Sequence, residues 1–265
     1  MKTAEVRNVT WNMNDDVYDW HRRLNSYEVG DNSIWNWHPV IGSEMASFIY
    51  LCMEREPKCF IDIGAHCGIF SSVYCSLVDN HECYSIEPVK EHMDRLKDTA
   101  ELNKWNLSTH KIALNNYTGK TYYHNTHMAM FVDDADYVVP DDIVSGVKEN
   151  TVINEVVVDT LDNFVKTNNI IPTLIKIDVE GYEIPVLQKA QETLSKYPID
   201  LLIETHRDEC KTLGWSIEEI CNYINTEQYV LYTHDFKEEI FDLKSFVLNN
   251  ESNMRFIAIN RKNVI

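Results

Sequence analysis

Four ionisable residues lie at the ends of two apolar stretches that are predicted to be strands: Asp178, Glu180, Glu204 and His206. Side chains two residues apart in extended chain point to the same side, and neighbouring strands lie only about 4.8 Å apart. If the two strands are neighbours in one parallel sheet, all four groups converge at its carboxyl edge, where such folds bind ligands. Groups of this kind can hold a hydroxyl and remove its proton.

Two chemistries fit this acidic block, and the residues leave both open. In the first, Asp178, Glu180 and His206 are catalytic, and either His206 or a carboxylate of raised pKa is the general base. In the second, Asp178 and Glu204 hold Mg²⁺ or another divalent cation, which lowers the pKa of a bound hydroxyl. A structural role also accounts for Glu180 and Glu183, since acids near a helix N-terminus interact favourably with the helix dipole.

The second chemical feature is a glycine-containing turn within residues 59–70, where an apolar run breaks at an acid and two glycines and then resumes. That order is typical of a buried strand, a tight loop and the start of a helix. Gly64 and Gly68 allow the backbone to approach a ligand without an intervening Cβ. Because the helix directs its N-terminal N–H groups at that ligand, the turn is predicted to bind a nucleotide or nucleoside.

The spacing within this turn favours one ligand over another. A dinucleotide-binding turn, G-x-G-x-x-G, would need glycine at position 62 and at position 67, where the chain has Asp62 and Cys67. Asp62 would repel a pyrophosphate, whereas it attracts a cationic sulfonium that carries an α-amino group. The residues therefore favour S-adenosylmethionine over NAD.

Two further positions extend the predicted cofactor site. Glu87 ends the next predicted strand, where doubly wound folds place an acid on the ribose hydroxyls. Ala113 lies in the turn that ends the third strand, and we expect it on the adenine side. Both positions agree with a cofactor that contains a nucleoside.

A resemblance to a known family is carried by four segments, which occur in this order within residues 58–206: FIDIGAHCGIFSS, SIEPV, LIKIDVEGYEIPVLQKA and LLIETH. In these segments the chain resembles the FkbM-type family of S-adenosylmethionine-dependent O-methyltransferases, whose known members methylate hydroxyls of sugars, polyketides and glycans. The resemblance implies a cofactor site with its methionine end at Asp62, Gly64 and Gly68, its ribose at Glu87, and loop contacts from Ala65 and His66. The chain departs from the family in carrying His66 and Cys67 inside the loop.

The implied fold is an α/β fold of the class I methyltransferase type, with a Rossmann-like, doubly wound sheet that is mostly parallel and has an antiparallel C-terminal strand. The chain's own pattern also alternates strands with helices, which favours a parallel sheet. Strands are predicted over 59–63, 83–88, 109–114, 121–124, 152–158, 173–178, 199–205, 228–233 and 254–260, and helices over 43–55, 69–79, 89–104, 159–168, 182–196 and 216–226.

The domain organisation is predicted to be one methyltransferase domain with additions. Residues 1–43 form an aromatic-rich N-terminal appendage with short helical patches, and residues 44–265 form the domain. The regular alternation lapses over about 115–158, which is predicted to be an insert with an irregular stretch at 125–150. Long inserts in regular folds are often functional.

Composition narrows the partners and the compartment. The 265 residues carry a formal net charge of −18, which disfavours nucleic acid because phosphate binding requires clustered basic residues. There is no apolar run of about 18 residues, so no membrane span is expected. The seven cysteines form no C-x-x-C motif and are predicted to be free thiols in a reducing cytoplasm. The oligomeric state is not predicted.

The sequence thus predicts a cytoplasmic enzyme that transfers a methyl group from S-adenosylmethionine to a hydroxyl of a sugar or glycan. The acceptor is a saccharide or another small molecule. The alternatives are a methyltransferase that acts on a different small molecule or a protein side chain, and a methyltransferase-like fold that binds without catalysis.

Overall fold

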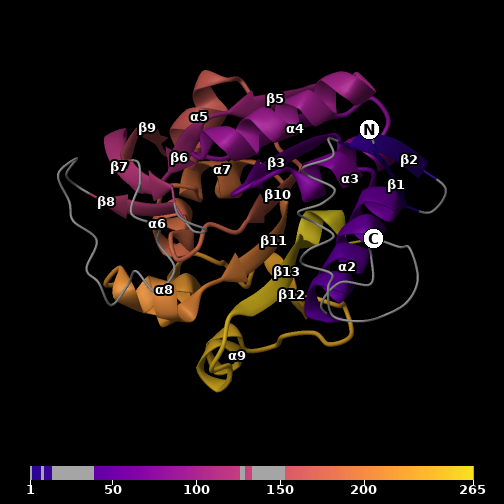
Figure 1. Ribbon diagram of the computed structural model, residues 1–265. Coiled ribbons are helices and arrows are strands. Elements are labelled where there is room, and N and C mark those ends of the chain that lie inside the picture. The colour runs from indigo at the N-terminus through magenta and orange to yellow at the C-terminus, as the bar shows by residue number, and fades with distance from the viewer. Residues whose placement is uncertain (1, 7–8, 14–38, 126–128, 133–152, 265) are drawn as a thin grey trace.

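The computed structural model describes residues 2–6, 9–13, 39–125, 129–132 and 153–264. Its centre is a seven-stranded sheet with helices on both faces (Figure 1). From one edge to the other the strands are β12 (Tyr229–Thr233), β13 (Met254–Asn260), β11 (Asp200–Thr205), β10 (Leu174–Ile177), β3 (Cys59–Ile63), β4 (Glu82–Ile86) and β5 (Leu107–His110).

Strand direction confirms the predicted class I methyltransferase fold. The five strands from β11 to β5 run parallel to their neighbours, and β13 is antiparallel to both β11 and β12. Since β13 comes last in the chain, it is the predicted antiparallel C-terminal strand. Strand β10 lies between β3 and β11, so the carboxyl ends of these three strands share one edge of the sheet.

Alternate residues of the central strands face opposite layers, as the pleat requires. Phe60 packs in the core of one face, together with residues of α2 (Pro39–Arg55) and α3 (Ile69–Leu77). Its neighbour Ile61 packs in the core of the other face, which includes residues of α5 (Leu161–Thr167), α6 (Glu183–Gln188), α7 (Gln191–Lys196), the 3₁₀ helix η1 (Ile217–Asn222) and α9 (Leu243–Asn249). The remaining helices are α4 (Lys90–Asn103), α8 (Arg207–Thr212) and the 3₁₀ helix η2 (Arg261–Asn263).

A second, four-stranded sheet includes the described strands of the predicted insert. Its order is β6 (Ile112–Leu114), β9 (Ile153–Asp159), β7 (Gly119–Asn125) and β8 (Ala129–Val132). The single strand predicted over 109–114 is wrong, because β5 ends at His110 in the large sheet and β6 joins the small one. Strand β8 falls within the stretch predicted to be irregular, and residues 126–128 and 133–152 lie outside the described residues.

The N-terminal prediction also needs correction. Strands β1 (Lys2–Val6) and β2 (Val9–Met13) form an antiparallel hairpin where short helical patches were predicted. Residues 14–38, the rest of the predicted appendage apart from the start of α2, lie outside the described residues. Helix α2 begins at Pro39, ahead of the predicted start, since proline suits the first helical position.

Two predicted helices differ from the structure in the C-terminal half. The helix predicted over 182–196 is divided into α6 and α7, and the one predicted over 216–226 is the shorter η1. Helices α8 and α9 were not predicted. Within the described part of the chain, no helix is both long and apolar enough to cross a membrane.

Candidate active site

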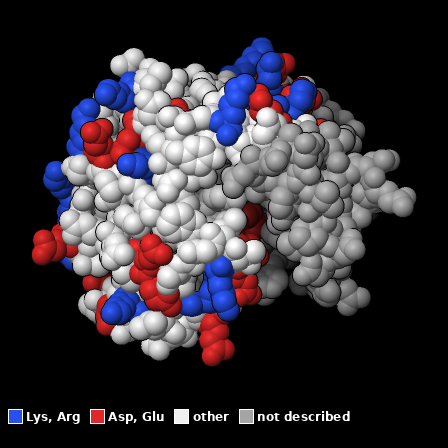
Figure 2. All heavy atoms as spheres, turned by 90° about the vertical axis from the view of Figure 1, so that its left-hand side faces the viewer, with Lys and Arg blue, Asp and Glu red and all other residues white. Residues whose placement is uncertain are grey.

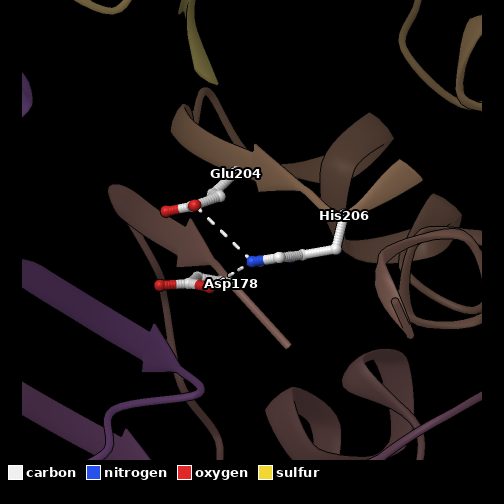
Figure 3. Close-up of side chains that lie close together, drawn as sticks. All are labelled: Asp178, Glu204 and His206. Atoms are coloured by element: carbon white, nitrogen blue, oxygen red, sulfur yellow. Dashed lines mark ion pairs between the residues drawn. The ribbon is translucent and has the colours of Figure 1, made fainter. Parts of the chain in front are cut away.

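The carboxyl ends of β10 and β11 bring the predicted acidic residues together. The two strands pair in parallel with Ile177 opposite Ile203, so Asp178 follows β10 beside the end of β11. Figure 3 shows the side chains of Asp178, Glu204 and His206 converging from these two strand ends. The Nε2 atom of His206 lies 3.8 Å from Asp178 Oδ1 and 3.5 Å from Glu204 Oε1.

Glu180 adds a fourth group at the outer side of this cluster. Its Oε2 lies 3.2 Å from His206 Nε2, and its side chain is 44% exposed. Its φ of +50° is an uncommon conformation for a residue other than glycine, and such strain often marks functional sites. Burial raises the pKa of the Glu180 carboxyl, an effect that the nearby His206 opposes. We refer to Asp178, Glu180, Glu204 and His206 as the acidic site.

Glu183 holds the imidazole of His206 on its Nδ1 side, opposite the acidic site. Its Nδ1 donates a hydrogen bond of 2.9 Å to Glu183 Oε1, which also accepts the backbone N–H groups of Val179 and Gly181. Burial by itself lowers the pKa of His206, but Glu183, Asp178 and Glu180 outweigh it and raise the pKa to about 9. The protein without another cation at this site therefore carries a protonated His206 at neutral pH. The sequence indicated only a helix-dipole role for Glu183.

A buried lysine fixes Asp178 from below. Lys176 Nζ donates to Asp178 Oδ2 at 2.7 Å and lies 4.8 Å from the centre of the Phe70 ring. Burial lowers the pKa of Lys176, but the carboxylates of Asp178, Asp62 and Glu44 outweigh it and raise that pKa. Burial raises the pKa of Asp178, but Lys176 and His206 overcome it and hold that pKa below its usual range. Asp178 Oδ1 remains on the side of His206.

Glu204 is held by Arg255, a residue that the sequence did not single out. The register of β11 and β13 places the two opposite each other, and Arg255 Nη2 donates to Glu204 Oε1. Arg255 Nε lies 3.2 Å from Oε2 of Glu44, which comes from α2. Burial raises the pKa of Glu204 to about 8 and that of Glu44 to about 7. Glu44 Oε1 is buried and has no hydrogen-bond partner among the described residues.

The glycine loop, residues 62–68, follows β3 at the same edge of the sheet. Gly64 and Gly68 have φ of +77° and +79°, which glycine adopts without strain. A Cβ on Gly64 would lie 1.7 Å from the Asp178 carbonyl oxygen, and one on Gly68 would lie 2.1 Å from the Leu96 side chain. The space that each missing side chain leaves is thus filled by the protein itself, rather than by a ligand as the sequence argument assumed.

Asp62 is completely buried beneath the loop. Its Oδ2 accepts hydrogen bonds from the Ser71 hydroxyl at 2.6 Å and the Ser71 backbone N–H at 3.2 Å, which tie the strand to the first turn of α3. Burial raises the pKa of Asp62, and Lys176 and Ser71 oppose this rise. Its Oδ1 has no hydrogen-bond partner among the described residues. A cofactor with an ammonium group offers donors of the kind that this oxygen lacks, so the residues present fit S-adenosylmethionine.

Glu87 is also used to hold the loop. One carboxylate oxygen accepts the backbone N–H of His66 at 3.0 Å, and the other accepts that of Val89 at 3.0 Å. Carboxylate oxygens have two lone pairs each, so Glu87 retains acceptor capacity for ribose hydroxyls. His66 has a backbone φ of +48°, and its ring contacts that of His92 in a tilted arrangement, with ring centres 3.7 Å apart.

The two alanines of the predicted cofactor site are both buried. Ala65 packs against residues of α4, and its backbone N–H donates to the Ile86 carbonyl. Ala113 lies in β6 and packs with Val89, Val156 and Val158. The structure therefore brings the loop, Glu87 and the Ala113 strand to neighbouring positions, and their contacts with a cofactor stay a prediction.

The loop and the acidic site form one continuous region, because the Asp178 carbonyl fills the space above Gly64. Figure 2 shows basic and acidic side chains interspersed on one face of the molecule. The three carboxylates around His206 Nε2 favour an uncharged or cationic ligand over an anionic one.

One family model and several solved structures are similar to this chain. The sequence model of the methyltransferase FkbM domain matches residues 62–231, which is more than half of the chain. No curated protein sequence matches. A methyltransferase FkbM from Methylobacillus flagellatus has a similar structure with 16% identity and a TM-score of 0.46, over 77% of this chain and 44% of that one. The O-methyltransferase of Bacillus cereus in complex with SAH gives 11% identity and a TM-score of 0.44, over 93% and 90%.

Proposed function

This chain belongs to the FkbM methyltransferase family, and we propose that it transfers a methyl group from S-adenosylmethionine to a hydroxyl of a sugar or glycan. The observation that carries this proposal is the convergence of Asp178, Glu180, Glu204 and His206 beside the glycine loop. A methyl acceptor must lie next to the methyl donor, and these polar groups lie beside the loop that is proposed to hold the donor. Their acceptor-rich character suits a molecule that carries hydroxyl donors.

The cofactor supplies a methyl group bonded to a positively charged sulfur. In the proposed reaction the acceptor oxygen forms a bond to the methyl carbon, while the carbon–sulfur bond breaks and its electron pair stays on sulfur. The hydroxyl proton must leave to a base. In this displacement the acceptor oxygen, the methyl carbon and the sulfur must lie in line. The protein contributes by holding the acceptor and the cofactor in that alignment.

We assign the proton-accepting role to Glu180. It is the most exposed carboxylate of the acidic site, and burial raises its pKa toward the range in which a carboxylate is an effective base. His206 already carries a proton at neutral pH in the protein without a bound cation, so it cannot take the first one. Asp178, held by Lys176, accepts a hydrogen bond from the acceptor and orients it.

A neutral, hydroxyl-rich acceptor fits the charges better than the rival classes. Several carboxylates lie at the site, so a substrate acid or a nucleic-acid phosphate would be repelled. Sugars present adjacent hydroxyls that can donate to more than one carboxylate at once. The seven cysteines are all free thiols, which supports the further proposal of a cytoplasmic location.

The test is methyl transfer from isotopically labelled S-adenosylmethionine to a panel of acceptors. Neutral mono- and oligosaccharides, hydroxylated small molecules, carboxylic acids, proteins and RNA are offered separately to the full chain. We expect label in a saccharide, at an oxygen identified by mass spectrometry and NMR. Glu192→Gln, an exposed acid in the first turn of α7, is the matched control for Glu180→Gln.

Three outcomes would overturn parts of the proposal. Label that appears only in protein, or only in an acid, rules out the saccharide class. Failure of the chain to bind S-adenosylmethionine by calorimetry would favour a methyltransferase-like binding module. Full activity of Glu180→Gln would exclude this residue as the base and leave the acceptor assignment intact.

A further inference from the structure

We propose that Asp178, Glu204 and His206 bind one divalent transition-metal ion, such as Mn²⁺ or Zn²⁺, with His206 Nε2 as the nitrogen ligand. The sequence predicted at most an ion held by the two carboxylates, with Mg²⁺ as the first choice. The structure adds an imidazole to the donor set, and this changes which metals fit.

The distances between the three groups suit a shared ion. One ligand atom from each residue lies within 4.8 Å of the other two. Two ligands bound at about 2.1 Å to one ion lie roughly 3 to 4 Å apart, depending on the angle between them. His206 Nε2 lies 3.5 Å from Glu204 Oε1 and 3.8 Å from Asp178 Oδ1, as Figure 3 shows. These separations are too long for ordinary hydrogen bonds and fall within the range for co-ligands.

The groups behind the ligands orient them as supporting groups do in metal sites. A metal-binding histidine usually donates its other ring N–H to a carboxylate, which fixes the ring and its tautomer. His206 does this through Nδ1 to the fully buried Glu183, so Nε2 faces the carboxylates of Asp178, Glu204 and the more exposed Glu180. Asp178 is oriented by Lys176 and Glu204 by Arg255. The His206 side chain is 6% exposed, so its direction is set by packing.

The balance of charges independently calls for a cation. Among the described residues, five carboxyl groups contact Lys176, Arg255 or His206: Asp178, Glu180, Glu183, Glu204 and Glu44. Lys176 and Arg255 are the permanent cations among these contacts, so the carboxyl groups outnumber them by three, five minus two. The buried Glu44 Oε1 without a hydrogen-bond partner belongs to this excess. A divalent ion would offset most of it.

The nitrogen ligand selects the kind of metal. Mg²⁺ and Ca²⁺ prefer oxygen ligands, whereas imidazole suits zinc and other first-row transition metals. Three protein ligands leave open positions, as in catalytic sites. An acceptor hydroxyl at such a position would become more acidic, and its proton would pass to Glu180. This catalytic use rests on the proposed methyl transfer, but the binding of the ion does not.

The experiment measures binding of metal to the full chain, with no acceptor present. Protein stripped with chelator is titrated with Mn²⁺, and free Mn²⁺ is followed by electron paramagnetic resonance. Zn²⁺ and Mg²⁺ are titrated by calorimetry. We expect one saturable Mn²⁺ per chain, and weaker binding of Mg²⁺. Glu204→Gln and His206→Gln should each lower the affinity by at least about tenfold, as should Glu183→Gln through the ring orientation. Glu192→Gln is the control and should bind as the parent does.

Each outcome decides the question. Absence of saturable binding in the parent chain overturns the inference, as does unchanged affinity in both Glu204→Gln and His206→Gln. Melting curves with and without Mn²⁺ show whether each variant is folded. If Glu204→Gln or His206→Gln is unfolded, the affinities of the other variant and of the parent decide the question. A chain that binds Mn²⁺ but methylates no hydroxyl would support the site and refute the function. A chain that binds no metal but still transfers methyl groups in the presence of chelator would support the function and refute the metal site.

Discussion

The glycine loop and the acidic site meet where the Asp178 carbonyl packs over Gly64, but they hold their carboxylates in different ways. In and beside the loop, Asp62 and Glu87 accept hydrogen bonds chiefly from backbone N–H groups and from a serine hydroxyl, and Glu87 Oε1 also lies 3.4 Å from His92 Nδ1. In the acidic site, the carboxylates contact Lys176, Arg255 and His206 instead.

This difference separates the roles of the two regions. Hydrogen bonds from uncharged donors fix the geometry of the loop over a wide range of pH, so the loop contributes chiefly to folding and to the shape of the cofactor site. The acidic site concentrates charge that is expensive to bury. Its residues should therefore matter for chemistry, and their contribution to stability should depend on pH and on bound cations.

The largest effect is expected from the acidic site, and on activity. Glu180→Gln keeps the size of the side chain but removes the proposed base, so kcat should fall by about 10² to 10⁴-fold. Because this side chain is 44% exposed, the free energy of unfolding should change by less than about 1 kcal/mol. Steady-state kinetics and urea denaturation of the same samples measure both. A large loss of stability with little loss of kcat would contradict the assignment of the acidic site to chemistry and of the loop to folding.

The second effect belongs to the loop, and to stability. In Gly64→Ala the new Cβ would lie 1.7 Å from the Asp178 carbonyl oxygen, at a φ of +77°. Backbone displacement and left-handed strain together should cost about 3 to 5 kcal/mol. Gly214→Ala is the matched control, since Gly214 has a φ of +83° and nothing within 4 Å of its Cβ position. It should cost only about 1 to 2 kcal/mol. Equal losses in the two variants would show that the contact with Asp178 is unimportant.

The regions also differ in how far sequence could predict them. The strand, turn and helix around the loop were predicted with the observed strand bounds, because an apolar run, two glycines and a second apolar run are local signals. The positions of Asp178 and Glu204 followed from strand ends in the same way. The reason for Gly64 could not be predicted, since it is a carbonyl on another strand.

The supporting residues of the acidic site required the fold. Arg255 meets Glu204 only through the register of the antiparallel β13, which no local pattern specifies. Glu44 comes from α2, far away in the sequence. Glu183 accepts a hydrogen bond from His206, a residue 23 positions later. Its place at a helix start predicted an interaction with the helix dipole but not this contact. Sequence therefore predicted the members of the acidic site better than the residues that hold them.

The third effect is a dependence of stability on pH in protein stripped of metal. The pKa of His206 is raised to about 9 in the folded chain, so the folded state keeps a proton that the unfolded state releases at a pKa of about 6.5. The resulting stabilisation, up to about 3 kcal/mol, is complete below about pH 6.5 and is lost as the pH rises through about 9. The raised pKa of Glu204, about 8, acts in the same direction. Urea denaturation between pH 6 and pH 9 measures this loss.

Glu183→Gln tests the cause of this dependence. Glu183 is the strongest of the groups that raise the pKa of His206, so the variant should lose less stability between pH 6 and pH 9 than the parent. The amide oxygen of glutamine can still accept the N–H groups of Val179 and Gly181. An identical pH profile in the variant would assign the dependence to other groups, and NMR titration of the His206 ring would identify them.

The smallest effect is expected in the loop, where it tests whether uncharged donors hold the Asp62 carboxylate. Ser71→Ala removes a hydroxyl that donates to Asp62 at 2.6 Å and also bonds to the Ser85 hydroxyl at 2.6 Å, and it leaves the Ser71 backbone N–H in place. A buried acceptor that loses one of two donors should cost about 1 to 2 kcal/mol. Ser76→Ala, also in α3, removes only a bond to a helix carbonyl and should cost less than about 0.5 kcal/mol.

Because neither serine carries charge, the difference in unfolding free energy between the two variants should be the same at low and high salt. A difference that shrinks with salt would mean that Lys176, rather than Ser71, is what holds Asp62, and the loop would then share the charged character of the acidic site.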